Sequence, residues 1–81
     1  MASDLHYWQN LPTDDDITAL LRLPVAERGR RLYDMSESER VAWAMVAARR
    51  ENGAPYRVME RFDGWRRAYL DSLQEARRAN A

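Results

Sequence analysis

The chain carries few of the side chains that enzymes use for covalent or acid–base chemistry. It has one histidine, His6, and no cysteine, and all 13 of its basic residues are arginine. A general base needs a positioned partner, and a nucleophile needs an activating neighbour. No second histidine, cysteine or lysine is present to complete such an arrangement. The sequence therefore predicts no catalytic site, and we expect a protein that is not an enzyme and has no small-molecule substrate.

The best candidate for a metal site is the acidic run Asp14, Asp15 and Asp16. Hard cations such as Mg²⁺ prefer carboxylate oxygens, but consecutive residues of a helix point about 100° apart and cannot converge on one ion. The glycine and distal glutamate of a calcium-binding loop are also absent. Three acids at a helix start instead complement the helix dipole. We expect no metal and no cofactor.

Arginines and aromatic residues are the remaining groups that could recognise a partner. The chain has three tryptophans, four tyrosines and one phenylalanine, and arginine doublets recur along it. Tryptophan, tyrosine and arginine are enriched at protein–protein hot spots, whereas arginines beside aromatics also suit phosphates and stacked bases. The absence of lysine is better explained by codon usage in a GC-rich bacterial or phage genome than by selection for bidentate carboxylate or phosphate contacts. The candidate partner-binding residues are Trp8, Tyr56, Arg57, Arg61, Trp65, Arg66 and Tyr69. The nucleic-acid alternative uses Arg57, Arg61, Arg66, Arg67, Arg77 and Arg78.

Charge is balanced overall but uneven along the chain. The net charge is zero and the pI is about 6.6, whereas nucleic-acid-binding domains are usually basic, with a pI above about 9. Residues 1–39 hold eight acids and four arginines, and residues 40–81 hold five acids and nine arginines. Either the two halves pack together and neutralise each other, or the basic half stays free for an anionic partner.

A 12-residue register sets the architecture that must position these residues. The stretches 11–16, 23–28 and 35–40 align at this step, each with an apolar residue followed by a helix-starting residue and an acid. In one continuous helix a 12-residue step rotates by roughly 120°, so the aligned positions would not form a stripe. The register therefore predicts separate short helices.

Cap signals place the helix ends. Thr13 is an N-cap candidate, Ser36 with Glu39 forms a capping-box pattern, and Asn52-Gly53 follows a cationic last turn. No segment shows the period-2 alternation of a strand. We expect an all-α fold, a small bundle of four to five helices in which short zig-zag helices pack on a long C-terminal helix. The expected ranges are about 14–22, 24–34, 37–51 and 55–79, and Ser3 or Asp4 starts a short first helix.

Three features bear on packing. Gly29, inside the second of these ranges, costs on the order of 1 kcal/mol relative to alanine, so this helix is expected to be the weakest. Residues 41–48 are all apolar, so this part of the helix is expected to be buried on most sides, with Trp43 in the core. The segment 55–79 would span about 37 Å, so Gly64 is expected to kink it or to split it into two helices. Trp65 is interpreted as either core or interface.

Length and composition complete the prediction. Eighty-one residues predict a single domain over 1–81, with residues 1–3 and 80–81 frayed. No signal peptide or membrane-spanning run is recognised, so we expect a cytoplasmic protein. We expect a small bacterial or phage interaction module, an adaptor, regulator or inhibitor that binds a protein partner or a second copy of itself. The alternative is a nucleic-acid-binding regulator.

Overall fold

Four helices make up the described part of the protein. The computed structural model describes residues 11–80, and these contain α2 (Asp14–Arg22), α3 (Val25–Tyr33), α4 (Glu37–Glu51) and α5 (Pro55–Ala79), with no strand among them. The all-α prediction is confirmed. The expected first helix, including Trp8, lies outside the described residues.

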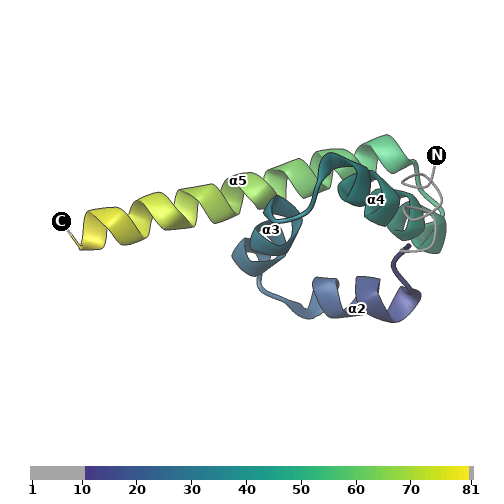
Figure 1. Ribbon diagram of the computed structural model, residues 1–81, viewed down its shortest axis with the longest axis horizontal. Coiled ribbons are helices and arrows are strands. Elements are labelled where there is room, and N and C mark those ends of the chain that lie inside the picture. The colour runs from purple at the N-terminus through teal and green to yellow at the C-terminus, as the bar shows by residue number, and fades with distance from the viewer. Residues whose placement is uncertain (1–10, 81) are drawn as a thin grey trace.

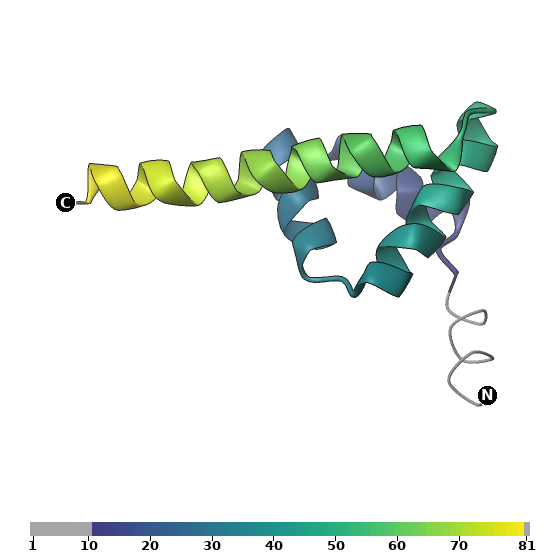
Figure 2. The ribbon, with the colours of Figure 1, turned by 90° about the horizontal axis from the view of Figure 1, so that it is seen from above.

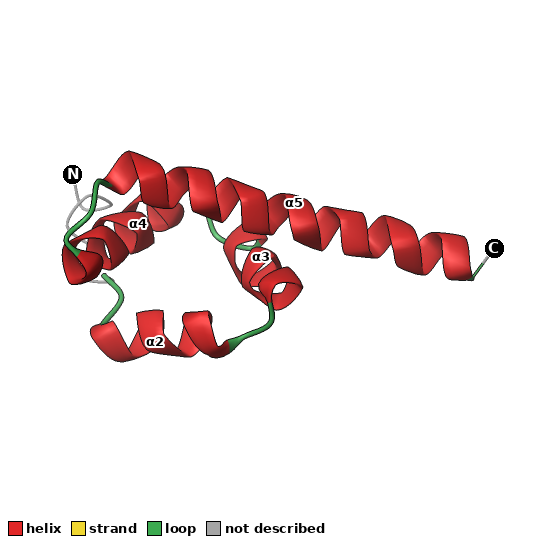
Figure 3. Cartoon of the chain, turned by 180° about the vertical axis from the view of Figure 1, so that it is seen from behind, coloured by secondary structure: helices red, strands yellow, loops and turns green. Residues whose placement is uncertain are grey.

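The helices form a compact unit with one long member. α3 and α4 both pack against α5, and α2 packs on α4 and α3. Figure 1 shows α2 across from α5, with α3 and α4 between them, and Figure 3 shows the same arrangement from behind. The principal dimensions are 47 × 29 × 21 Å, and the long one follows α5.

Local capping determines where the short helices begin and end. Thr13 forms a capping box with Asp16, and Ser36 forms one with Glu39, with hydrogen bonds of 2.9–3.2 Å in both. Each box satisfies backbone N–H groups that lack a partner within the helix. α4 ends at Asn52, whose φ of 56° is left-handed. α3 begins at Val25 rather than one residue earlier, because the preceding proline is its N-cap.

Arginine side chains cap the C-terminal ends of α2 and α3. Arg28 donates from Nε to the Leu23 carbonyl at 2.8 Å and from Nη2 to the Leu21 carbonyl at 2.7 Å. Arg40 donates from Nη1 to the carbonyls of Leu32 and Met35. Both arginines stand at the sixth place of their 12-residue unit and reach back to its first residue, five positions earlier. In two of the three units the register therefore corresponds to the same contact, in which an arginine of one helix binds the C-terminal end of the preceding helix.

The same register supplies the centre of the core. The tenth residues of the three units are Leu20, Leu32 and Ala44, and all three are at most 3% exposed. They pack with Val58 and Phe62 from the first half of α5. Each short helix thus contributes the tenth residue of its 12-residue unit to one cluster, which packs against the long helix.

α3 crosses α5 unusually closely because Gly29 lies at the crossing. Gly29 is buried, and a Cβ added to it would lie 1.9 Å from the carbonyl oxygen of Trp65. Figure 2, seen from above, shows α3 crossing behind α5. The glycine that weakens α3 as an isolated helix is therefore what allows α3 to pack. The propensity cost is offset by the contact it permits.

α5 is one continuous helix. Its 25 residues run from Pro55 to Ala79 through Gly64, which has no other atom within 4 Å of an added Cβ. The two-helix alternative is therefore wrong, and Figures 1 and 2 show α5 as a single rod. Its far end leaves the globule, and residues 70–80 are all exposed.

Three expectations about buried faces need correction. Within the apolar stretch of α4, Val41 and Met45 are 37% and 41% exposed, because α4 faces its neighbours mainly through alanines. Trp43 packs against the core but is only partly buried. The i, i+3 and i+4 spacing of Ile17, Leu20 and Leu21 predicts one buried face on α2, yet Leu21 is 42% exposed. The helical spacing identified these helices correctly but overestimated how much of each is covered.

Candidate interaction surfaces

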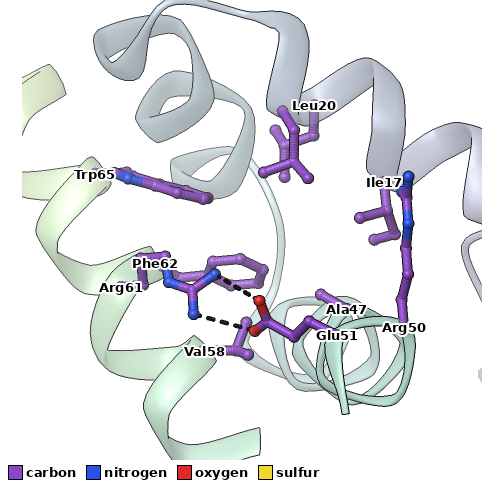
Figure 4. A pocket seen from close by; sticks show the side chains of 10 residues that line it. Ile17, Leu20, Ala47, Arg50, Glu51, Val58, Arg61, Phe62 and Trp65 are labelled. Carbon is purple, nitrogen blue, oxygen red and sulfur yellow. Dashed lines mark hydrogen bonds and ion pairs between the residues drawn. The ribbon is translucent and has the colours of Figure 1, made fainter. Parts of the chain in front are cut away.

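An apolar pocket lies between α2, α4 and α5. It has a volume of about 180 Å³ and is walled by buried side chains together with Ala47 and Trp65. Figure 4 shows these side chains converging from the three helices. The most buried wall residues are Ile17, Leu20, Val58 and Phe62, each at most 3% exposed.

Charged side chains surround the mouth of this pocket. Arg61 on α5 holds Glu51 at the end of α4 through two hydrogen bonds, of 3.0 and 3.3 Å, drawn as dashed lines in Figure 4. Arg50 stands beside Ile17 in the same view and donates from Nη1 to the Asp14 carbonyl at 3.0 Å. The carboxylate partner of Arg61 is therefore Glu51, on a different helix.

Trp65 packs against the core and also lines the pocket. Its backbone carbonyl contacts Gly29, and its ring lies 5.5 Å from that of Phe62. The Arg28 guanidinium lies 4.9 Å from the centre of the indole, within cation–π range. The same side chain lines the pocket. Trp65 is therefore half-buried, fixed by α3 and available to the pocket.

A second cluster lies where α3 meets the outer half of α5. The rings of Tyr33 and Tyr69 are 5.7 Å apart, and the Arg66 guanidinium lies 5.9 Å from the centre of Tyr33. Arg66 also pairs with Asp63 at 3.3 Å. The sequence predicts Leu32 and Tyr33 on the apolar side of α3; Leu32 is buried, whereas Tyr33 is 48% exposed.

The core-facing stripe of α5 continues beyond this cluster without a cover. Leu70 and Leu73 are 43% and 39% exposed, and Leu73 continues the three- and four-residue spacing of the buried positions. Figure 1 shows this end of α5, in yellow, projecting past α3. We call the following set the α5 extension surface: Tyr33, Arg66, Tyr69, Leu70 and Leu73.

The structure distributes the predicted partner-binding residues over three places. Arg61 and Trp65 line the pocket, whereas Arg66 and Tyr69 belong to the α5 extension surface. Tyr56, 62% exposed, lies at the start of α5, with the Arg57 guanidinium 6.0 Å from its ring centre. Trp8, which was also predicted to bind a partner, lies outside the described residues. The predicted set is therefore not one site.

Sequence reasoning missed the residues that complete these places. The sequence predicts a core-facing position for Tyr33 and for Leu73, and it does not single out Leu70. Helical spacing does not reveal where the covering helix ends. Glu51 was missed because its partner is ten residues away, across a turn. Its position in the last turn of α4, opposite the start of the next helix, was the available signal.

No family model, curated protein or solved structure matches the chain. Within residues 11–80, no three His, Cys, Asp or Glu side chains are grouped so that they could hold a metal ion. No helix in that range is long and apolar enough to cross a membrane.

Proposed function

We propose that this protein acts by binding, as a small interaction module whose contact surface is the α5 extension surface. The observation that supports this proposal is the uncovered continuation of the α5 core stripe. Exposed apolar residues on successive turns of a projecting helix suit a helix-in-groove contact, in which spaced anchors enter a partner's groove. The occupant of the surface is a protein partner or a second copy of the chain.

The composition of the surface supports a protein contact. Tyr33, Tyr69 and Arg66 form a packed aromatic and guanidinium cluster beside Leu70 and Leu73. Tyrosine and arginine are enriched among residues that dominate binding energy, and packing in the free protein lowers the entropy they lose on binding. The surface is therefore preorganised at one end and open at the other.

The test compares two variants of α5. Leu70→Gln combined with Leu73→Gln removes the apolar anchors, and Glu75→Gln is the matched control on another face of the same exposed stretch. Sedimentation velocity of each protein over a wide concentration range measures self-association. Affinity purification from the producing cell, with and without nuclease, measures binding to other proteins.

Two results would support the proposal. In the first, the wild type and the control variant self-associate and the double variant does not. In the second, the wild type and the control variant bind a protein that is still recovered after nuclease treatment, and the double variant does not bind it. Far-UV circular dichroism must show the same helix content in all three. Identical sedimentation and identical recovered proteins in the three samples would overturn the proposal.

A nucleic-acid-binding regulator is the second candidate, and one observation favours it. Each of the three ion pairs among residues 11–80 joins two residues of the same half of the chain, one pair in the acidic half and two in the basic half, so none of them links the two halves. Arg67, Arg77 and Arg78 are exposed on the outer part of α5. This candidate predicts binding of DNA or RNA that weakens steeply with salt. Failure to retard either at low salt would remove it.

A further inference from the structure

The pocket between α2, α4 and α5 has the size of a single ring. Its volume of about 180 Å³ exceeds the roughly 150 Å³ of an engineered protein cavity that binds benzene. It is well below the roughly 300 Å³ at which pockets for drug-sized ligands and cofactors begin. The deep walls are apolar, since Ile17, Leu20, Val58 and Phe62 are at most 3% exposed, whereas Leu21, 42% exposed, and three exposed charged side chains line the outer part. A six-membered ring suits this space, and a nucleotide or flavin does not.

The charges at the mouth favour one negative group on that ring. Glu51 and Arg61 satisfy each other through two hydrogen bonds, so this pair is neutral as a unit. The Arg50 guanidinium has five N–H donors, of which one is used on the Asp14 carbonyl. The mouth therefore carries one excess positive charge. A monoanion suits it better than a phosphate, whose second charge would lie beside Glu51.

We propose that this pocket binds a small aromatic carboxylate, with the ring between Leu20, Phe62 and Trp65 and the carboxylate at Arg50. Arg50 presents a planar set of donors, and a carboxylate is the anion whose geometry matches it best. A free small acid is preferred to a partner's side chain because the apolar walls are the buried part of the pocket, whereas its charged residues are exposed. A side chain attached to a bulky backbone would reach those walls less deeply. This inference goes beyond the proposed function and does not rest on the α5 extension surface.

The test is a titration of the full chain with three probes, followed by ¹H–¹⁵N correlation spectra. Phenylacetate has the ring and the charge, 2-phenylethanol has the ring without the charge, and acetate has the charge without the ring. For a ligand of this size we expect phenylacetate to bind at about millimolar concentration. It should shift the Trp65 indole and the Ala47 amide. We expect 2-phenylethanol to bind roughly tenfold more weakly and acetate not to shift these signals.

Variants locate the two halves of the ligand. Ala47→Leu fills the pocket from α4 and should abolish the shifts caused by phenylacetate. Arg50→Gln should weaken phenylacetate roughly tenfold and leave 2-phenylethanol unchanged. Arg49→Gln, the exposed neighbour that does not line the pocket, is the charge-matched control and should bind as the wild type does. Cross-relaxation between phenylacetate ring protons and the Phe62 ring in the wild type locates the ligand even if a variant fails to fold.

Each remaining outcome decides against the proposal. The absence of saturable shifts with phenylacetate overturns the site, and equal binding of the charged and neutral probes overturns the role of Arg50. Tighter binding of acetyl-Asp-Phe-amide than of phenylacetate overturns the small acid as the occupant, and would indicate a partner's side chain instead. Loss of phenylacetate binding in the Leu70 and Leu73 double variant would place the ligand on the α5 extension surface and also overturn the pocket.

Discussion

Gly29 and Gly64 lie inside helices of the same protein, and replacing each by alanine should have opposite effects. A Cβ at position 29 would lie 1.9 Å from the carbonyl oxygen of Trp65 and 2.9 Å from the Cβ of Tyr69. A Cβ at position 64 would have no such neighbour within 4 Å. Both substitutions bring the same gain in helix propensity, so comparing them isolates the contact at the crossing.

The magnitude follows from how far α3 would have to withdraw. Ordinary contact begins at 3.4 Å, so α3 must move from α5 by about 1.5 Å, because the atom in its way is backbone and cannot rotate aside. A gap of 0.5–1 Å already removes roughly a quarter to a half of the dispersion energy of each contact along an interface. Such overpacking costs about 3 kcal/mol, against a propensity gain of about 1 kcal/mol. We expect Gly29→Ala to lose about 2 kcal/mol and Gly64→Ala to gain about 0.5–1 kcal/mol.

Urea and thermal unfolding followed at 222 nm measure both values. In a domain of this size about 1 kcal/mol corresponds to roughly 4–8 °C, so the midpoint of Gly29→Ala should fall by roughly 8–16 °C. That of Gly64→Ala should rise by a few degrees. If the two variants were equally stable, or Gly29→Ala the more stable, the close crossing of α3 and α5 would be refuted.

Three further substitutions test the capping and pairing described above. Arg28→Met should lower the free energy of unfolding by about 2 kcal/mol, because it removes two charged hydrogen bonds to helix-end carbonyls. Arg31→Met, at an exposed neighbouring position, is the control and should lower it by less than about 0.5 kcal/mol. Urea unfolding measures both values. Ser36→Ala should cost about 1 kcal/mol through loss of the capping box, whereas Ser38→Ala two residues later should be neutral or slightly stabilising in the same assay. Arg61→Met should cost less than about 1 kcal/mol, since its ion pair is exposed, and the loss should shrink in 0.5 M salt; an undiminished loss would contradict a surface pair.

The helix ends were predictable because the groups that determine them are local. Thr13, Ser36 and Asn52 each act within a few residues of their own position, through side-chain bonds to nearby N–H groups or a left-handed φ. Such interactions depend on spacing that the sequence displays directly. The expected ranges of all four described helices accordingly agree with the observed ones to within a residue at each end.

The buried faces were less predictable because covering a face requires another helix at the right place. Val41 and Met45 belong to an apolar stretch, yet α4 is covered on its alanine side and these two remain exposed. Gly29 shows the converse. Its cost to an isolated helix can be estimated from propensity, but its benefit depends on the Trp65 backbone, 36 residues away. Tertiary contacts of this range leave no mark in local periodicity.

The candidate surfaces follow the same division. Aromatic and arginine content indicated α5 as the segment to examine, but not the contacting residues that α3 and α4 bring to it. Tyr33 joins Tyr69 only because the helices cross at Gly29, and Glu51 joins Arg61 only because the α4–α5 turn is short. Those pairings depend on the crossing and the turn, not on the residue types.

The arginines divide into two groups, and the division indicates where binding is to be sought. Arg28, Arg40 and Arg50 donate to backbone carbonyls of other helices or helix ends, a task that uses the several donors of a guanidinium. Arg28 and Arg40 also occupy equivalent places in the 12-residue register. Their contribution to stability is therefore enough to explain why arginine recurs at this place. The exposed arginines near the end of α5 make no ion pair or hydrogen bond within residues 11–80 and do not contribute to the core. Selection for folding therefore accounts for the first group, whereas the outer part of α5, with its exposed leucines, is where selection for a partner would act.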